Sequence, residues 1–393
     1  MRTPNSFRLM TLALLLLVVL AVPAHAEDTR QIRLRGLVDI AVNNTNHASE
    51  IATFNGDDSP LQSQRLRLFV EGSATPNIDV FTQVVLAQDV LFLDGAYALI
   101  TPWRERDLHL MAGKIPWPIG TWAPRTYSNK NPLVTSPLMY QHHTSLRWDD
   151  MPPDPAALLA AAGTGWDGAD YGNDSGSPGM PIVDDYGWDF GVVALGTISR
   201  VEFSGGVTNS APGWGSPGED VNDGKAYMGR IGFVPTAGVR LGVSAAQGAY
   251  LGDWVRFGLP ADKTEADYQQ SLFMADLSYE RGHVELRAEA FSNDWETAYC
   301  GTLKSTGGYL EGRFGFDNGI WLAARAEAMR HSDLTDGVIT RPWDDEVDRL
   351  DTCLGYRISR GAAIKGDWQR TRIHAIDGEQ SFDLFIGQLS LEF

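Results

Sequence analysis

The sequence predicts a transmembrane antiparallel β-barrel of about sixteen strands. Three observations predict it. Apolar and polar residues alternate with a period of two over most of the chain, and short connections alternate with long ones. In addition, beyond the N-terminal segment no stretch reaches the roughly 18 consecutive apolar residues that a membrane helix needs. An even number of strands places both ends of the chain on one side of the membrane, as short periplasmic turns and long outer loops require.

The N-terminal segment is typical of a secretory signal peptide. Two arginines precede the apolar run 9–22, and an Ala-x-Ala sequence follows at 24–26. This run is too short to span a bilayer comfortably, and the Ala-x-Ala sequence suits removal. We therefore expect a cleaved signal peptide over residues 1–26 and a barrel domain over residues 27–393.

The charge of the mature chain excludes some classes of partner. Removal of the two arginines in the leader leaves 30 Lys and Arg against 50 Asp and Glu. A surface with this excess of negative charge repels nucleic acid and anionic lipid headgroups. Nucleic acid is therefore not an expected partner, whereas lipid can still contact the apolar wall of a barrel.

The alternation locates the strands. In QIRLRGLVDIAV (31–42), apolar side chains fall on one face and Arg33, Arg35 and Asp39 on the other. A soluble β-sandwich would also alternate, but the continuous apolar faces, the aromatic residues near strand ends and the regular connections favour a membrane barrel. The predicted strands are 31–42, 62–72, 76–87, 91–101, 106–115, 186–196, 198–208, 225–235, 237–248, 268–280, 282–292, 306–316, 318–330, 347–358, 360–374 and 380–393.

The C-terminal run SFDLFIGQLSLEF continues the alternation to Phe393. Phe385, Leu389, Leu391 and Phe393 share one face, and polar residues share the other. We expect this strand to pair with the first one, because a closed barrel leaves no strand edge exposed to lipid.

Charged residues on the polar faces predict a water-filled lumen. A Lys or Arg facing lipid at the bilayer midplane costs roughly 2–4 kcal/mol, and sixteen strands leave an aqueous channel. Pairing across strands is the alternative role for these charges. The first two and the last few strands supply most of the basic residues expected to line the pore: Arg33, Arg35, Arg65, Arg67, Arg313, Arg325, Arg349, Arg357 and Lys365.

The connection at 117–185 is far longer than any other, and structureless connections of that length are usually functional. It contains the candidate site residues Asp149, Asp150, Asp184 and Asp185. We predict that it folds into the lumen as a constriction loop. An acidic loop opposite a basic wall would create a transverse field that affects ion selectivity. A surface loop is the alternative.

The stretch HLMAGKIPWPIG (109–120) resembles the strand-to-loop segment of the phosphate-selective porin O/P family. Gly113, Lys114, Pro116 and Trp117 match its Gly-Lys-x-Pro-aromatic-x-Gly pattern, and Gly120 follows one residue later than the last glycine of that pattern. The resemblance implies a bacterial porin in which this segment leaves a strand and enters the constriction loop. It places Lys114 among the residues of the constriction.

These patterns together predict a porin in the outer membrane of a Gram-negative bacterium. We expect passive diffusion of ions and small hydrophilic solutes, with weak selectivity for cations at low salt. Porins of this size are often trimers, so the resemblance also implies a homotrimer. Two alternatives remain: a barrel that encloses a multihaem cytochrome in an electron conduit, and a channel specific for one solute.

Catalytic and metal-binding motifs are not evident. The sequence has no G-x-S-x-G or H-E-x-x-H motif and no C-x-x-C-H motif, so we expect neither an enzyme nor a bound cofactor. The pair His142-His143 lacks a placed carboxylate and is a weak metal site. Cys300 and Cys353 leave open one disulfide or two free thiols.

Overall fold

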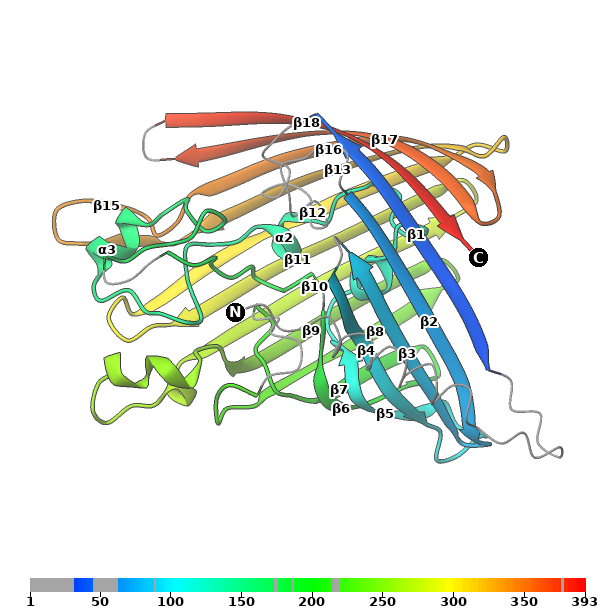
Figure 1. Ribbon diagram of the computed structural model, residues 1–393, viewed down its shortest axis with the longest axis horizontal. Helices are drawn as coiled ribbons and strands as arrows, with labels where there is room; N and C mark the ends of the chain where they lie inside the picture. The colour runs from blue at the N-terminus through cyan, green and yellow to red at the C-terminus, as the bar shows by residue number, and fades with distance from the viewer. Residues whose placement is uncertain are drawn as a thin grey trace.

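The computed structural model describes residues 32–44, 63–87, 90–172, 176–185, 187–213, 220–375 and 378–393. They form a closed barrel of sixteen antiparallel strands, in which each strand pairs with its neighbours along the chain and β1 pairs with β18 (Figure 1). The predicted fold class is confirmed. The predicted signal peptide lies outside the described residues.

The barrel strands keep the order of the sequence. They are β1 (Arg33–Asn43), β2 (Ser63–Thr75), β3 (Ile78–Ala87), β4 (Val90–Ile100), β5 (Leu108–Pro116), β6 (Trp188–Ile198), β7 (Val201–Thr208), β8 (Ala226–Thr236), β9 (Val239–Ala249), β10 (Gln269–Arg281), β11 (Val284–Glu296), β12 (Thr302–Gly315), β13 (Ile320–His331), β16 (Glu346–Ser359), β17 (Ala362–Ala375) and β18 (Gly378–Glu392).

All sixteen predicted strands are present, and most of their ends agree within two or three residues. The largest differences are at β11 and β12, which extend four residues further toward the long connections than predicted. These strands continue pairing past the point where the apolar face ends. One further hairpin, β14 (Asp333–Thr335) with β15 (Thr340–Pro342), was not predicted and lies in the connection between β13 and β16.

The wall has the expected two faces. On β13, Leu322 faces outward and is 50% exposed, whereas Arg325 faces inward and is fully buried. The same alternation continues along β16, β17 and β18. The outward face is apolar, and the inward face holds most of the charged residues of the strands.

The helices are short. They are η2 (Ala123–Arg125), α2 (Leu138–Gln141), α3 (Pro155–Ala160), η3 (Asp253–Gly258) and η4 (Glu265–Asp267). None of the helices in the described segments is long and apolar enough to cross a bilayer.

The barrel closes between its first and last strands, as predicted. Ile40 pairs with Leu389, and at the end of the seam the N–H groups of Gly36 and Phe393 donate to each other's carbonyl oxygens at 2.8 and 3.0 Å. A Cβ atom on Gly36 would overlap the ring of Phe393. The aromatic ring thus covers the glycine on the neighbouring strand, an arrangement that fixes strand register.

Gly36→Val is therefore expected to displace the ring of Phe393 and weaken the seam. We expect a lower yield of folded, heat-modifiable barrel on denaturing gels. Gly366→Val on β17 is the control, because a Cβ atom there would meet no atom within 4 Å. Equal yields from the two variants would contradict the proposed role of this contact.

Candidate functional site

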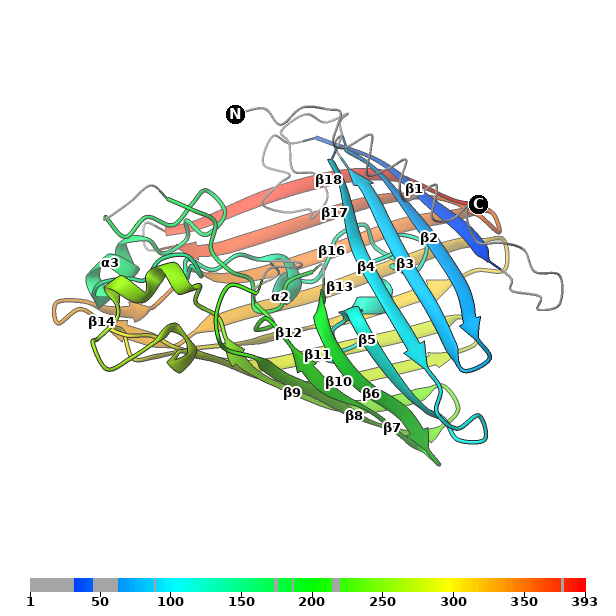
Figure 2. The ribbon, with the colours of Figure 1, turned by 60° about the horizontal axis from the view of Figure 1, so that its bottom comes forward.

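The candidate site is the lumen together with the loop that crosses it between β5 and β6, of which residues 117–172, 176–185 and 187 are described. This loop leaves β5, enters the barrel and returns to β6. In both views of the ribbon its helix α2 lies between opposite walls, against β12 and β13 (Figure 2). The predicted inward placement of the loop is confirmed.

Two glycines shape the entry of the loop. Gly113 has φ +128°, and a Cβ atom there would lie 2.9 Å from the Cα of Tyr97 on the adjacent strand. Gly120 has φ +59°, and its Cβ atom would lie 2.6 Å from the hydroxyl of Tyr140. Only glycine adopts these conformations without strain. Backbone conformation and close contacts thus explain why glycine occupies positions 113 and 120 of the stretch 109–120.

Lys114, the charged residue of the same motif, is buried. Its Nζ donates to the carbonyl oxygen of Leu93 on β4 at 2.7 Å. The ammonium group therefore lies in the barrel wall, between β4 and β5, near the point where the chain leaves β5.

The first anchor of the loop lies on β9 and β11. The N–H and hydroxyl of Thr121 donate to Oε1 of Glu289, the latter at 2.8 Å, and the hydroxyl of Tyr140 donates to Oε2 at 2.7 Å. The N–H of Gly120 donates to the hydroxyl of Ser244 at 3.0 Å. A single buried carboxylate thus accepts three hydrogen bonds from two separate segments of the loop.

The second anchor is centred on Arg325. Its guanidinium lies 2.9 Å from Glu327, 2.6 Å from Asp351 and 3.4 Å from Glu311. It also donates to the hydroxyl and carbonyl oxygens of Thr135 at 2.8 and 3.2 Å.

The three carboxylates around Arg325 hold the loop as well. Glu311 pairs with Arg125, Glu327 accepts from the N–H of Leu138 at 2.6 Å, and Asp351 accepts from the hydroxyl of Thr135 at 2.8 Å. Because one guanidinium and its three carboxylates bind both wall and loop, they join these two parts into one network.

The third anchor is on β17. Nζ of Lys365 donates to the carbonyl oxygens of Ser128, Asn131 and Leu133 at 2.7 to 2.9 Å. Two residues along the strand, Asp367 accepts from the N–H of Val134 at 2.7 Å. These wall side chains satisfy backbone groups of the loop that would otherwise be buried without partners.

Apolar packing fills the space between the anchors. Aromatic and aliphatic residues of the loop contact inward-facing apolar residues of strands β8 to β16. The loop side supplies Trp117, Ile119, Trp122, Leu138, Met139 and Tyr140, and the wall side includes Met228, Met274, Phe291, Tyr309 and Met329. The middle of the lumen is therefore packed as a core over this part of the wall.

Among the described residues of the loop, Asp149 and Asp150 do not face the basic wall as expected. Arg325 and Lys365 face loop oxygens that are mostly backbone carbonyls. Asp149 and Asp150 pair instead with Arg147 of the same loop, at 2.8 and 3.7 Å. The physical reason is that the loop reaches the wall with its backbone, whereas its acidic residues lie further along it.

These acidic residues lie at the end of the barrel with the long connections. The carbonyl of Asp149 accepts from Nε1 of Trp254 in η3 at 3.1 Å, and the N–H of Asp184 donates to Pro212 in the connection between β7 and β8 at 2.8 Å. Asp185 follows directly in the chain and is partly exposed. Negative charge therefore gathers at this mouth.

The remaining predicted basic residues have varied positions. Arg349 is buried and donates to Gln141 of α2 at 3.2 Å. On the first two strands, Arg35 pairs with Glu71, Arg65 pairs with Asp39, and Arg67 donates to the carbonyl oxygen of Thr126 in the loop. Arg313 on β12 pairs with Glu285. Arg33 and Arg357 are exposed and line separate cavities at the short-turn end.

His142 and His143 are partly buried where the loop leaves α2. Burial lowers the pKa of His142 to about 3, with the positive charge of Arg349 adding to the effect, and lowers the pKa of His143 to about 4. His143 stacks on Trp166 at 3.9 Å. Among the described residues no group of three or more His, Cys, Asp or Glu is placed to hold a metal ion.

Acid is expected to weaken the docking of this part of the loop. Both histidines are neutral in the docked loop because their pKa values are lowered there, so a released loop binds more protons once the pH falls below about 6.5. Between pH 6.5 and 4, each histidine then reduces the stability of the docked loop by up to about 1.4 kcal/mol for every pH unit. Hydrogen exchange of residues 138–146 at pH 7.5 and 5, corrected for intrinsic rates, should show the loss. A His142→Gln/His143→Gln variant should show none, and equal losses in both proteins would contradict this account.

Cys300 and Cys353 are free thiols, both buried. Of the two alternatives left open by the sequence, the structure has the unpaired one.

The carboxylates that anchor the loop were not among the predicted site residues, although the alternation of their strands puts them on the charged face. They are Glu289, Glu311, Glu327, Asp351 and Asp367. In the sequence they are marked only by their alternation with apolar residues. Inward-facing charged residues that do not contact the loop show the same alternation, so the pattern does not distinguish the two groups.

Comparison with known proteins defines the fold. No family model matches the chain, and no curated protein matches it. Solved structures do match over nearly their whole length: OmpT, an outer membrane protein of Vibrio cholerae (9% identity, 95% of this chain and 100% of that chain, TM-score 0.55), an anion-selective porin from Comamonas acidovorans (10%, 92% and 99%, 0.55) and the outer membrane channel DcaP of Acinetobacter baumannii (10%, 94% and 99%, 0.54). The chain therefore has the fold of the bacterial outer-membrane porins.

Proposed function

We propose that the chain is a bacterial outer-membrane porin that passes ions and small hydrophilic solutes by passive diffusion. The observation that carries this proposal is a closed sixteen-stranded barrel with an apolar outer face and charged inner face. Such a wall suits lipid outside and water inside. The similarity in fold to solved porins supports the same function.

The proposed route is narrow. The loop is anchored to β9, β11, β12, β13, β16 and β17, so it occupies much of the cross-section. Arg33 and Arg357 are exposed at cavities and are the better candidates for contact with passing ions. Arg325 and Lys365 hold the loop, and Lys114 holds its entry.

A barrel enclosing a multihaem cytochrome is less well supported. A threaded cytochrome would need the space that the loop occupies, and the anchors would have to break. A homotrimer stays a proposal, supported by the trimer form of the OmpT barrel (10% identity, TM-score 0.54). The finer resemblance to phosphate-selective porins rests on the motif around Lys114.

Liposome swelling with solutes of graded size tests this function. We expect glycerol to enter liposomes that contain the folded barrel and disaccharides to be excluded. Glu289→Ala removes the acceptor of three loop hydrogen bonds and should raise the size limit. Glu202→Ala is the control, because this inward carboxylate pairs with Arg230 and Arg240 on the wall. A folded barrel that admits no solute would contradict the proposal.

A further inference from the structure

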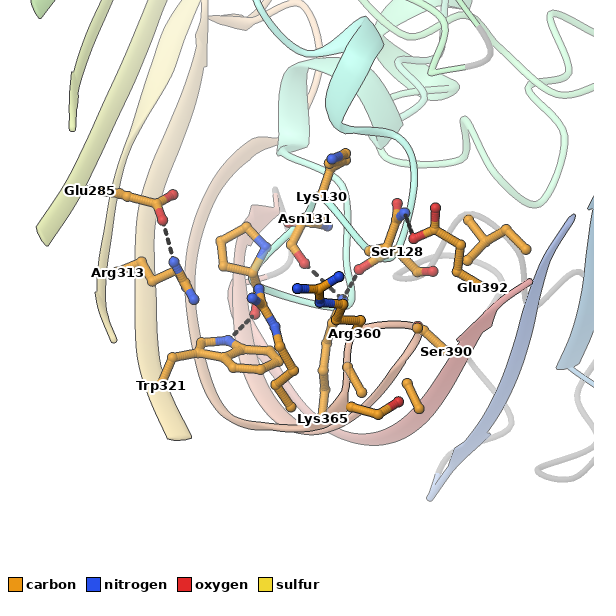
Figure 3. Close-up of a pocket in the computed structure, with 18 of the residues that line it drawn as sticks. Ser128, Lys130, Asn131, Glu285, Arg313, Trp321, Arg360, Lys365, Ser390 and Glu392 are labelled. Atoms are coloured by element: carbon orange, nitrogen blue, oxygen red, sulfur yellow. Dashed lines mark hydrogen bonds and ion pairs between the residues drawn. The ribbon is translucent and has the colours of Figure 1, made fainter. Parts of the chain in front are cut away.

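A polar cavity of about 510 Å³ lies at the short-turn end of the barrel (Figure 3). Loop residues 128–132 form one side of it. The other sides come from the short-turn ends of strands between β10 and β18, from Leu37 on β1 and from the turn 359–361 between β16 and β17. The cavity thus lies between the inward loop and the mouth opposite the acidic connections.

Basic side chains outnumber acidic ones around this cavity. The acidic residues are Glu280, Glu285 and Glu392. The basic residues are Lys130, Arg287, Arg313, Arg357, Arg360 and Lys365.

Half of these basic groups have partners. Lys365 donates to three loop carbonyls, as described above. Arg313 pairs with Glu285, and Arg287 lies 3.6 Å from the same carboxylate. Since one carboxylate serves two guanidinium groups, even this paired part of the cavity keeps a positive excess.

The other three basic side chains are free of internal partners. Lys130, Arg357 and Arg360 are exposed, and none of them makes a side-chain hydrogen bond or ion pair with any other residue in the described part of the chain. Figure 3 labels Lys130 on the loop and Arg360 on the turn at the same cavity. On the acidic side, Glu392 accepts from Asn129 at 2.9 Å. Three cations are therefore available to a ligand from solution.

We propose that this cavity binds a small organic anion with two or three carboxylate groups, entering from the short-turn end. Guanidinium groups present paired donors that match carboxylates, and lysine adds a mobile point charge. The cavity of about 510 Å³ is much larger than a single compact anion. Such an anion would leave most of the cavity filled with water, at about 30 Å³ for each water molecule. A polycarboxylate fits both the volume and the number of free cations.

The two mouths of the barrel differ in charge, so binding is expected to depend on the side of addition. Asp149, Asp150 and Asp184 lie at the long-connection end, where they repel an approaching polyanion. If the chain is the porin proposed above, a bound polycarboxylate reduces the ionic current, and it does so from the short-turn side. This blockade rests on the proposed function, whereas binding itself does not.

Citrate is the probe. We expect citrate in one chamber of a planar bilayer to reduce the current through singly inserted barrels, and citrate in the other chamber to have little effect. The double variant Arg357→Gln/Arg360→Gln should require at least tenfold more citrate. The matched control is Arg200→Gln/Arg240→Gln, which removes the same charge at the same mouth from residues that do not line the cavity. The citrate concentration that reduces the current of this control should stay within twofold of the concentration needed for the parent protein.

Calorimetric titration of the detergent-solubilised barrel with citrate separates the two proposals. Binding without any channel activity would contradict the porin and leave the site intact, whereas a conducting barrel that binds no citrate would overturn the site. Inorganic phosphate binding as tightly as citrate would overturn the polycarboxylate class. An equal loss of affinity in both double variants would show a general field of the mouth and would overturn the assignment to this cavity.

Discussion

Replacing Arg325 with methionine is expected to release the loop and to destabilise the barrel strongly. Arg325 is fully buried and is the cation shared by Glu311, Glu327 and Asp351. Its removal leaves three buried carboxylates without this partner and breaks the hydrogen bonds to Thr135. Loss of one partner from a buried ion pair costs about 3–5 kcal/mol.

Two measurements check this expectation. Denaturant unfolding in detergent micelles should give a lower free energy of unfolding, and limited proteolysis should cut within residues 117–187 much faster. Arg230→Met is the control, since this inward arginine pairs with Asp276 and Glu202 of the wall. A loop as resistant to protease in the Arg325 variant as in the control would contradict the proposed anchor.

Gly113→Ala is expected to prevent normal assembly. The residue combines φ +128° with close approach to Ala96 and Tyr97 of β4, so an added methyl group meets backbone and also strains its own conformation. Each such strain costs on the order of 1–3 kcal/mol, and here the adjacent strand would also have to move. We expect little folded protein in outer-membrane fractions.

Gly366→Ala serves as the control for this variant. It lies within β17 and has no atom within 4 Å of an added Cβ. Assembly of Gly113→Ala at the level of this control would show that β5 can enter the loop without glycine, which would remove the physical reason given for this part of the motif.

The strands could be predicted because one physical cause sets their pattern along the whole chain. The pleat sends successive side chains to opposite faces, and lipid and lumen demand different chemistry on the two faces. Gln64 to Glu71 and Gly319 to Met329 show the alternation directly, and both lie largely within observed strands, β2 and β13. The ends of the strands are harder to predict, because backbone pairing continues beyond the last apolar residue of the outward face.

The anchors of the loop could not be predicted in the same way. Alternation places Arg325 on the inward face, but it does not show which segment covers that face. Arg325 meets Thr135 across 190 residues of chain, and Lys365 meets Ser128 across 237. Contacts at such separation depend on the path of the loop, which has no period. For the same reason, Asp149 and Asp150 were expected opposite the basic wall and pair instead with Arg147 nearby.

The conductance of the purified barrel in a planar bilayer tests the central claim most directly. The account predicts stable, small current steps in the parent protein and larger steps in Arg325→Met or Glu289→Ala, because release of the loop widens the route through the lumen. A correctly folded barrel that stays electrically silent, in the parent protein and in both variants, would contradict the proposal that this chain is a diffusion porin.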